Sequence, residues 1–185
     1  MIILASASPR RKALLDASGW APVVIPADVD ETPLPREPPR ALVERLARHK
    51  ASAVRAGADD VVVAADTTVA VDDAVLNKPV DDDDARRMLR LLSGRPHAVY
   101  TGWCVRRGDV VDGGVVETMV AFRTLADDDI DAYLRTGEHR DKAGAYGIQG
   151  AAAVLVSSVH GSLTNVIGLP VDEVVAALRA IGAST

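Results

Sequence analysis

Asp66 stands at a point of the sequence where a carboxylate needs a partner. It follows the apolar run VVVAA at 61–65, which predicts a strand buried on both faces. A carboxylate beside such a strand loses hydration unless a cation, a metal ion or hydrogen bonds compensate it. In open α/β sheets, ligands also bind beyond the carboxyl ends of strands. We interpret Asp66 as a functional carboxylate. The alternative is a cap for the next turn, but no helical pattern follows it.

The opening segment MIILASASPRRKALL has the features of an anion site. Residues 2–4 predict a short buried strand, and Ser8-Pro9 predicts the N-cap and first residue of a helix. Free amides and the helix dipole attract anions at such a start. Serine hydroxyls can donate to phosphate oxygens, and Arg10 and Arg11 can add bidentate contacts. The alternative interpretation is a capped helix with solvated arginines.

Four further residues are weaker candidates when each is taken alone. Lys78, held by the proline after it, could present a point charge to phosphate. Glu31 lies in an acidic, proline-rich loop and could join Asp66 as an oxygen ligand of a hard cation such as Mg²⁺. Lys50 lies near the end of a predicted helix, where the helix dipole also favours a cation. Gln149, between turn-forming glycines, could offer its amide to a nucleobase edge.

Other patterns point to structure rather than chemistry. The acidic run at 81–84 precedes an apolar helical pattern, so capping and dipole matching explain it better than metal binding. The four histidines lack metal-ligand spacing, and Cys104 lies in a predicted strand, which favours the core. Walker, GxGxxG and GxSxG motifs are missing from the sequence.

The totals limit the class of protein. The 185 residues suit a single domain, 1–185, and a lone cysteine excludes an internal disulfide framework, which is typical of a reducing cytoplasm. A net charge of -5 argues against binding to nucleic acid polymers or anionic membranes. The apolar runs are too short to cross a bilayer, and the N-terminus lacks the order of a signal peptide. These features predict a cytoplasmic protein; a homodimer stays open.

The elements that must position these residues follow from periodicity and turn signals. Strands and helices alternate in both halves with a hairpin between them, which favours an α/β fold with a mixed sheet. We expect the hairpin to turn near Gly108-Asp109. The strands are expected at 2–4, 23–25, 61–65 continuing over 68–71, 98–106, 110–122 and 154–159, and the helices at 9–18, 40–55, 81–92, 127–134 and 171–181.

Eight segments in order resemble the motifs of the Maf nucleotide pyrophosphatases over essentially the whole chain. They are SASPRRKALL, the glutamate of DVDE, the lysine of LARHK, AADTTV, NKP, LSGRPHAVYTG, DKAGAYGIQG and NVIGLP. The resemblance implies a fold like that of inosine triphosphate pyrophosphatases. This is an elongated mixed β-sheet flanked by helices, in two α/β lobes with a central cleft. It also implies hydrolysis of a nucleoside triphosphate to the monophosphate and pyrophosphate with a divalent cation, Mg²⁺ or Mn²⁺.

The resemblance assigns roles to individual positions. The aspartate of the ADT motif, the proton acceptor of the family, matches Asp66, and together with Glu31 it is the expected metal ligand. Positions that tune base choice match Arg10, Thr67 and Gln149. The expected phosphate-binding set, to which the helix start adds Ser8, comprises Ser6, Ser8, Arg11, Lys50 and Lys78.

The subgroup that acts on dTTP and UTP is similar to this chain in ADT and AYGIQG, whereas the subgroup that acts on 7-methyl-GTP differs there. We therefore expect dTTP and UTP as substrates, with clearance of modified nucleotides left open. The Gln149 amide could pair with O4 and N3–H of uracil or thymine if Arg10 or Thr67 holds it in one orientation. The competing class is a nucleotide-binding regulator of septation without significant catalysis.

Overall fold

The computed structural model of the protein describes residues 1–72 and 74–184; Asp73 and Thr185 lie outside the described residues. A seven-stranded mixed sheet runs along the molecule in the order β2-β1-β3-β5-β6-β7, and β4 pairs with β3 beside this path. The strands are β1 (Ile2–Leu4), β2 (Val23–Val24), β3 (Val61–Val71), β4 (Ala74–Leu76), β5 (Pro96–Arg107), β6 (Val110–Phe122) and β7 (Val156–His160). The expected mixed α/β fold is confirmed.

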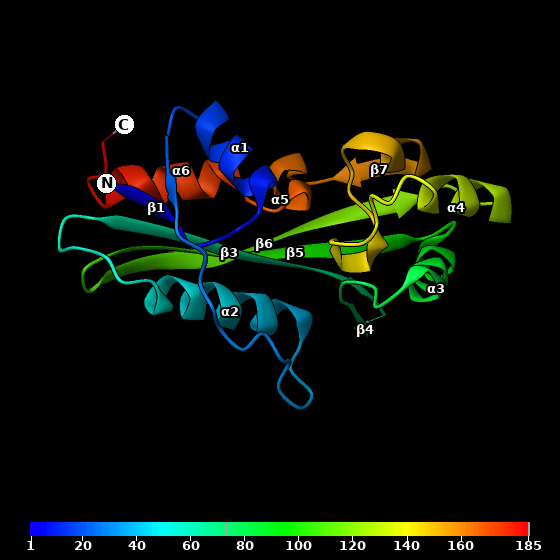
Figure 1. Cartoon of the computed structure of the whole chain (residues 1–185), viewed down its shortest axis with the longest axis horizontal. Helices are drawn as coiled ribbons and strands as arrows, with labels where there is room; N and C mark the ends of the chain where they lie inside the picture. Colours follow the sequence, from blue (N-terminus) through cyan, green and yellow to red (C-terminus); the bar gives the residue numbers. More distant parts are fainter. Residues whose placement is uncertain (73, 185) are drawn as a thin grey trace.

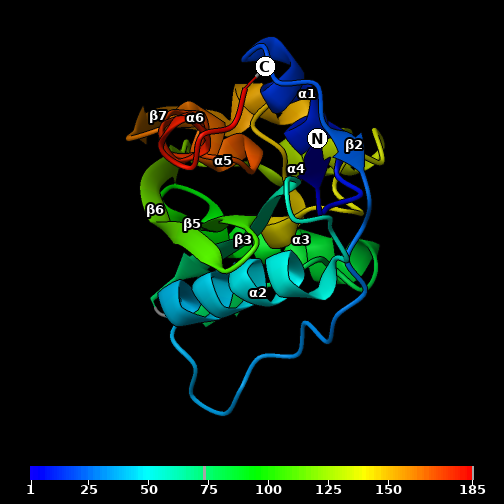
Figure 2. The same ribbon diagram turned by 90° about the vertical axis from the view of Figure 1, so that its left-hand side faces the viewer.

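Helices cover both faces of this sheet (Figure 1). The α-helices are α1 (Pro9–Ala17), α2 (Pro39–Ala53), α3 (Asp82–Leu92), α4 (Asp127–Leu134), α5 (Leu163–Ile167) and α6 (Val171–Ala180), with two 3-10 helices, η1 (Ala143–Ala145) and η2 (Gly150–Leu155). Figure 2 shows α2 on one face of the sheet and α1, α5 and α6 on the other. None of the helices in the described part of the chain is long and apolar enough to cross a membrane.

The long strands β3, β5 and β6 form the central part of the sheet. β1 pairs in parallel with β2 and β3, whereas β3, β5, β6 and β7 pair in antiparallel fashion. The hairpin of β5 and β6 turns at Gly108-Asp109, as the sequence predicts. These strands extend along the length of the molecule, so the two ends share one sheet (Figure 1).

Two regions of hydrophobic core lie along β3. Its first half, 61–65, packs into clusters built with α1 and α6 on one face and α2 on the other. Its second half, from Val69 onward, packs into a cluster with α3 and α4. The polar triplet Asp66-Thr67-Thr68 lies between these cores. The sheet is therefore continuous, but its apolar packing is interrupted where the polar residues lie.

Helix α2 approaches the sheet closely at Gly102 in β5. A Cβ atom at this position would lie 2.1 Å from the backbone oxygen of Val43 in α2, so a side chain cannot fit. The hydrophobic face of α2, with Leu42, Leu46 and Ala47 buried, is thus held against the strands. This packing fixes the position of Lys50 on the same helix.

Three sequence-based expectations need correction. The apolar run at 154–159 was expected as strand, but Val154 and Leu155 close the helix η2 and the strand starts at Val156. The sequence pattern did not predict β4 or α5. Asp66 lies in the middle of β3 and not at a carboxyl end, because the strand continues through the threonines to Val71.

Candidate active site

One cavity of about 560 Å³ lies between the two cores. All ten residues that the sequence predicted for a site line it: Ser6, Ser8, Arg10, Arg11, Glu31, Lys50, Asp66, Thr67, Lys78 and Gln149. They come from the start of α1, the loop before α2, α2 itself, β3, the loop after β4 and the loop before η2. Segments far apart in the chain therefore supply one surface.

Lys50 joins two carboxylates at one wall of the cavity. Its Nζ atom lies 2.6 Å from Oδ1 of Asp66 and 2.7 Å from Oε1 of Glu31. The Lys50 side chain is 9% exposed and that of Asp66 is 13% exposed, so their attraction is little screened by water. Partial burial raises the pKa of Glu31, but the hydrogen bond and charge of Lys50, with Lys78, outweigh this and hold that pKa below its ordinary value.

Arg11 forms the opposite part of the site through three neutral partners. It donates from Nε to the carbonyl of Gly168 at 2.8 Å, and from its two terminal nitrogens to Ser6 Oγ and Thr67 Oγ1, each at 3.1 Å. Burial lowers the pKa of Arg11, which Asp66 opposes, and a guanidinium remains charged in proteins. The contacts use three of its five N–H groups, so the other two can donate to an anion.

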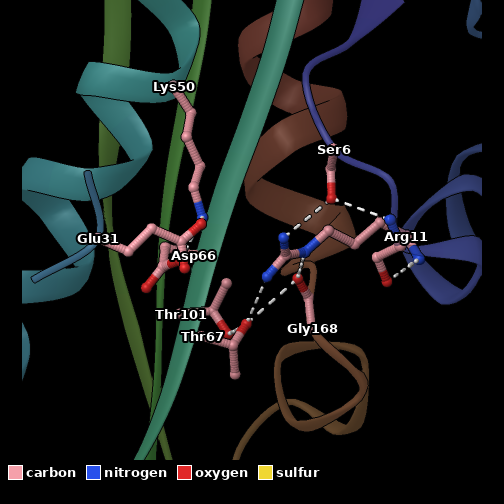
Figure 3. A network of polar contacts seen from close by, with 9 residues as sticks. Ser6, Arg11, Glu31, Lys50, Asp66, Thr67, Thr101 and Gly168 are labelled. Atoms are coloured by element: carbon pink, nitrogen blue, oxygen red, sulfur yellow. Dashed lines mark hydrogen bonds and ion pairs between the residues drawn. The ribbon is translucent and has the colours of Figure 1, made fainter. Parts of the chain in front are cut away.

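Asp66 and Thr67 direct their side chains to opposite sides of β3 (Figure 3). Asp66 bonds to Lys50 of α2, and Thr67 bonds to Arg11 of α1. This follows from the pleat of a strand, in which successive side chains alternate between the faces. Two adjacent residues thereby connect the strand to a basic residue on each face.

Ser6 and Ser8, which precede α1, hold the start of the helix and can also bind a ligand. Ser8 caps the helix, its Oγ accepting from the backbone N–H of Arg11 at 3.5 Å. Ser6 Oγ accepts from the backbone N–H of Ser8 at 3.2 Å as well as from Arg11. Because a hydroxyl that only accepts keeps its own hydrogen, both serines can still donate to a ligand.

The other wall of the cavity is the loop from 141 to 149. Arg10 reaches across to it, with Nη1 3.4 Å from Oδ2 of Asp141, and Lys142 Nζ contacts the other oxygen of Asp141 at 2.7 Å. Gln149 is exposed at the end of this loop and makes no side-chain capping bond to η2. Lys78 is exposed on the loop after β4.

The sequence predicts that Arg10 or Thr67 holds the Gln149 amide in one orientation, but both side chains bond to other residues. Thr67 bonds to Arg11 and, at 2.9 Å, to Thr101, and Arg10 pairs with Asp141. Both residues line the same cavity as Gln149, but their hydrogen bonds go elsewhere. Arg10 and Thr67 therefore do not supply the expected restraint through these hydrogen bonds.

The carboxylate pair has the right chemistry for a hard divalent cation. Glu31 and Asp66 each place an oxygen within 2.7 Å of the single Lys50 ammonium, so two carboxylates already converge on one cationic group. Oxygen donors suit Mg²⁺ or Mn²⁺, which bind through one or two carboxylates and substrate phosphates. Among residues 1–72 and 74–184, no group of three or more His, Cys, Asp or Glu could form a cage of protein ligands. The site fits a cation that the substrate helps to hold.

Sequence reasoning missed several residues that complete the site. Gly168 ends α5 with φ 128°, a left-handed conformation that favours glycine, and its carbonyl receives Arg11. Thr101, which is fully buried, connects Thr67 to the carbonyl of Asn165 at 3.0 Å. Gly168 and Thr101 belong to the motifs NVIGLP and LSGRPHAVYTG, and Asp141 begins DKAGAYGIQG, so motif membership was the available signal.

Comparison with known proteins places the chain among known relatives. Residues 1–181 match the family described as Maf-like protein. Similar proteins named dTTP/UTP pyrophosphatase include one from Anaeromyxobacter dehalogenans (strain 2CP-C), 54% identical over 98% of this chain and 94% of that protein. Others come from Geobacter sp. (strain M21) and Sphingopyxis alaskensis, each 50% identical over 98% of this chain and 96% of the relative.

Among solved structures, a HAM1 protein from Coxiella burnetii aligns with a TM-score of 0.49 and 16% identity, covering 97% of this chain and 98% of the other. That likeness is too low to support an argument. The family match extends over nearly the whole chain, and the relatives share about half of its residues. The chain belongs to the Maf-like protein family.

Proposed function

We propose that this protein hydrolyses dTTP and UTP to the monophosphate and pyrophosphate. The observation that carries the proposal is the position of Asp66, a carboxylate in the cavity wall between Lys50 and the half-buried Arg11. The name shared by the relatives gives the reaction and the bases. A reaction that attacks a triphosphate needs positive charge around the phosphates and a base for water, and the cavity offers both.

In this mechanism the basic residues bind the triphosphate. Arg11 presents its remaining N–H groups, and Ser6 and Ser8 add hydroxyl donors. Arg10 and Lys78 supply further charge from the cavity rim. Fixed donors in a cavity stabilise the charge that develops between the α- and β-phosphates at lower reorganisation cost than water does.

Asp66 accepts the proton of the attacking water. Its Oδ1 accepts a hydrogen bond from Lys50, which orients the carboxylate in the cavity wall. A water molecule bonded to the carboxylate can then attack the α-phosphorus while its proton passes to Asp66, and pyrophosphate leaves.

Glu31 and Asp66 would hold the divalent cation, Mg²⁺ or Mn²⁺. When bound, such a cation supplies charge neutralisation on the phosphate oxygens. The convergence of both carboxylates on one ammonium supports this assignment. Arg10, Thr67 and Gln149 are the proposed determinants of base choice, with Gln149 reading the base edge from its loop.

A panel of nucleotides tests the proposal. Release of pyrophosphate should be measured for dTTP, UTP, CTP, dATP, GTP and 7-methyl-GTP with Mg²⁺ and with Mn²⁺. We expect the highest kcat/KM for dTTP and UTP. Binding of these nucleotides without release of pyrophosphate would instead favour the regulatory, non-enzymatic class.

A further inference from the structure

Tyr146 in the cavity wall has a buried partner that the mechanism does not use. Its hydroxyl lies 2.7 Å from Nε2 of His97, which is 1% exposed in β5. The two rings are also in edge-to-face contact, with centroids 5.4 Å apart, and both meet the ring of Phe122. His97 thus lies behind the cavity and contacts one residue of its lining.

The loop that Tyr146 belongs to is conformationally unusual. Gly144 has φ 69° and Ala145 has φ 61°, and alanine rarely adopts this left-handed conformation. A Cβ on Gly144 would lie 3.0 Å from the side chain of Val69, so the turn is pressed against β3. Such a conformation persists only where surrounding contacts determine it.

The contacts that hold this turn are few and identifiable. The backbone N–H of Gly144 donates to the carbonyl of Asn77 at 3.3 Å, and that of Ala145 donates to Lys142 at 3.0 Å. Directly after the strained residue, Tyr146 inserts its ring into the core and bonds to His97. The side chain of Tyr146 is an anchor of the turn, because it is 5% exposed and follows Ala145 directly.

We propose that His97 is a positioning residue for base recognition, which acts by anchoring Tyr146 and thereby the loop 143–149 that presents Gln149. The proposal rests on the proposed function for the identity of the substrate. Gln149 follows Tyr146 by three residues, and both line the cavity. A shift of the loop would therefore move the amide relative to the base while Asp66 and Arg11 stay in place on β3 and α1.

The neutral state of both partners supports this role. Burial lowers the pKa of His97 to about 4 and raises the pKa of Tyr146, so a neutral imidazole faces an intact phenol at neutral pH. Such a hydrogen bond orients the phenol of Tyr146 without adding charge beside a cavity that must bind a polyanion.

The test compares variants of this hydrogen bond. His97→Phe and Tyr146→Phe each keep an aromatic ring and remove the bond, whereas His97→Gln keeps a polar group that can reach the phenol. For UTP we expect KM to rise about tenfold with kcat nearly unchanged in both phenylalanine variants, as loss of ground-state positioning predicts. The preference for UTP over CTP should shrink in both, the double variant should be no worse than either, and His97→Gln should restore the preference.

A matched control separates positioning from general loss of stability. Val120→Ala removes core volume at the cross-strand neighbour of His97, in the hydrophobic cluster that contains Tyr146 and Phe122, and leaves the hydrogen bond intact. It should lower Tm and leave the UTP to CTP ratio of kcat/KM unchanged. If it moves that ratio as much as His97→Phe does, the role of His97 is structural only and the proposal is wrong.

Amide hydrogen exchange gives a readout that needs no turnover. In His97→Phe, amides of 143–149 should exchange faster while those of β3 and α1 keep wild-type rates. Unchanged exchange in this loop would overturn the proposal. Failure of the proposed function has a different signature, since wild-type protein would then release no pyrophosphate from any nucleotide of the panel.

Discussion

The ammonium of Lys50 lies 2.6 Å from Oδ1 of Asp66, and both side chains are largely buried between α2 and β3. The pair joins the helix to the strand at one wall of the cavity. Glu31 reaches the same ammonium from a loop, so three segments of the chain meet at one charge. This arrangement lets single substitutions separate the chemical role of Asp66 from its structural role.

Asp66→Asn should lower kcat by about 10²–10⁴-fold, because the amide cannot accept the proton of water. The fold should persist, since the amide oxygen can still accept a hydrogen bond from Lys50 and Glu31 still neutralises that lysine. Circular dichroism and kcat for UTP check both parts. Asp59→Asn, at a 96% exposed carboxylate, is the matched control and should keep wild-type turnover. Near wild-type kcat in Asp66→Asn would exclude it as the base.

Turnover should require a divalent cation and stop when EDTA is added. Glu31→Gln should raise the Mg²⁺ concentration that gives half-maximal rate by about tenfold or more, because it removes one of two anionic ligands. Titration of the rate with MgCl₂ measures this. Glu44→Gln, at an exposed residue paired with Arg48, should give the wild-type curve. Full activity in EDTA would mean that the basic residues alone neutralise the phosphates.

Gly102→Ala should destabilise the protein by about 1–3 kcal/mol or more and reduce activity. The new Cβ would overlap the backbone of Val43, so α2 would have to move and take Lys50 with it. Urea unfolding and kcat/KM report the two effects. Gly114→Ala, where the Cβ would be 3.5 Å from Trp103, adds the same methyl in ordinary contact and should have little effect. Equal stability of the two variants would refute the close packing.

The unfolding free energy should fall as the pH drops from 6.5 towards 4. Burial lowers the pKa of His97 from 6.5 to about 4 in the folded protein, so within this window the unfolded chain binds a proton that the folded chain does not. Its contribution, about 3 kcal/mol, is complete above pH 6.5 and is lost towards pH 4. Urea unfolding of wild type and His97→Gln between pH 4.5 and 7.5 should give a steeper decline for wild type. Parallel curves would contradict the assignment.

Gln149→Ala should flatten base preference more than it lowers the best rate. Its carboxamide can donate to O4 and accept from N3–H of uracil or thymine, and CTP leaves these groups mismatched at a cost of about 1–3 kcal/mol, or roughly ten- to a hundredfold in kcat/KM. The measurement is kcat/KM for dTTP, UTP and CTP on both proteins. The same ratios before and after the change would show that the base is read by other residues.

The sequence predicted the residues of the cavity better than it predicted their connections. Buried strands, helix starts and glycine-rich turns are local patterns, so the elements carrying Asp66, Arg11 and Lys50 were found. The link from Arg11 to Gly168 spans 157 positions and involves a backbone carbonyl, which has no side-chain signature. The contact of Tyr146 with His97 could not be predicted either, because nothing in the sequence indicates that this histidine is buried or which residue it contacts.

Two local errors have physical causes. An apolar run such as AAAVLV suits a buried strand or a buried turn of 3-10 helix equally, so periodicity alone could not place the start of β7. The sequence predicts Asp66 at the end of a buried strand because the apolar run VVVAA stops at Ala65. Asp66 is accommodated within β3 because the cavity interrupts the core there and Lys50 compensates its charge.

The long separation of Arg11 and Gly168 bears on when the protein can act during its synthesis. The guanidinium reaches its final position only after Gly168 has been translated and α5 has docked, since that carbonyl accepts its Nε hydrogen. Similarly, Arg10 pairs with Asp141, which follows it by 131 residues in the sequence. A nascent chain that ends before Gly168 contains Asp66 and Lys50 but lacks the carbonyl that accepts the Nε hydrogen of Arg11. Complete assembly of the contacts that hold Arg11 therefore requires translation to pass α5 and reach Gly168.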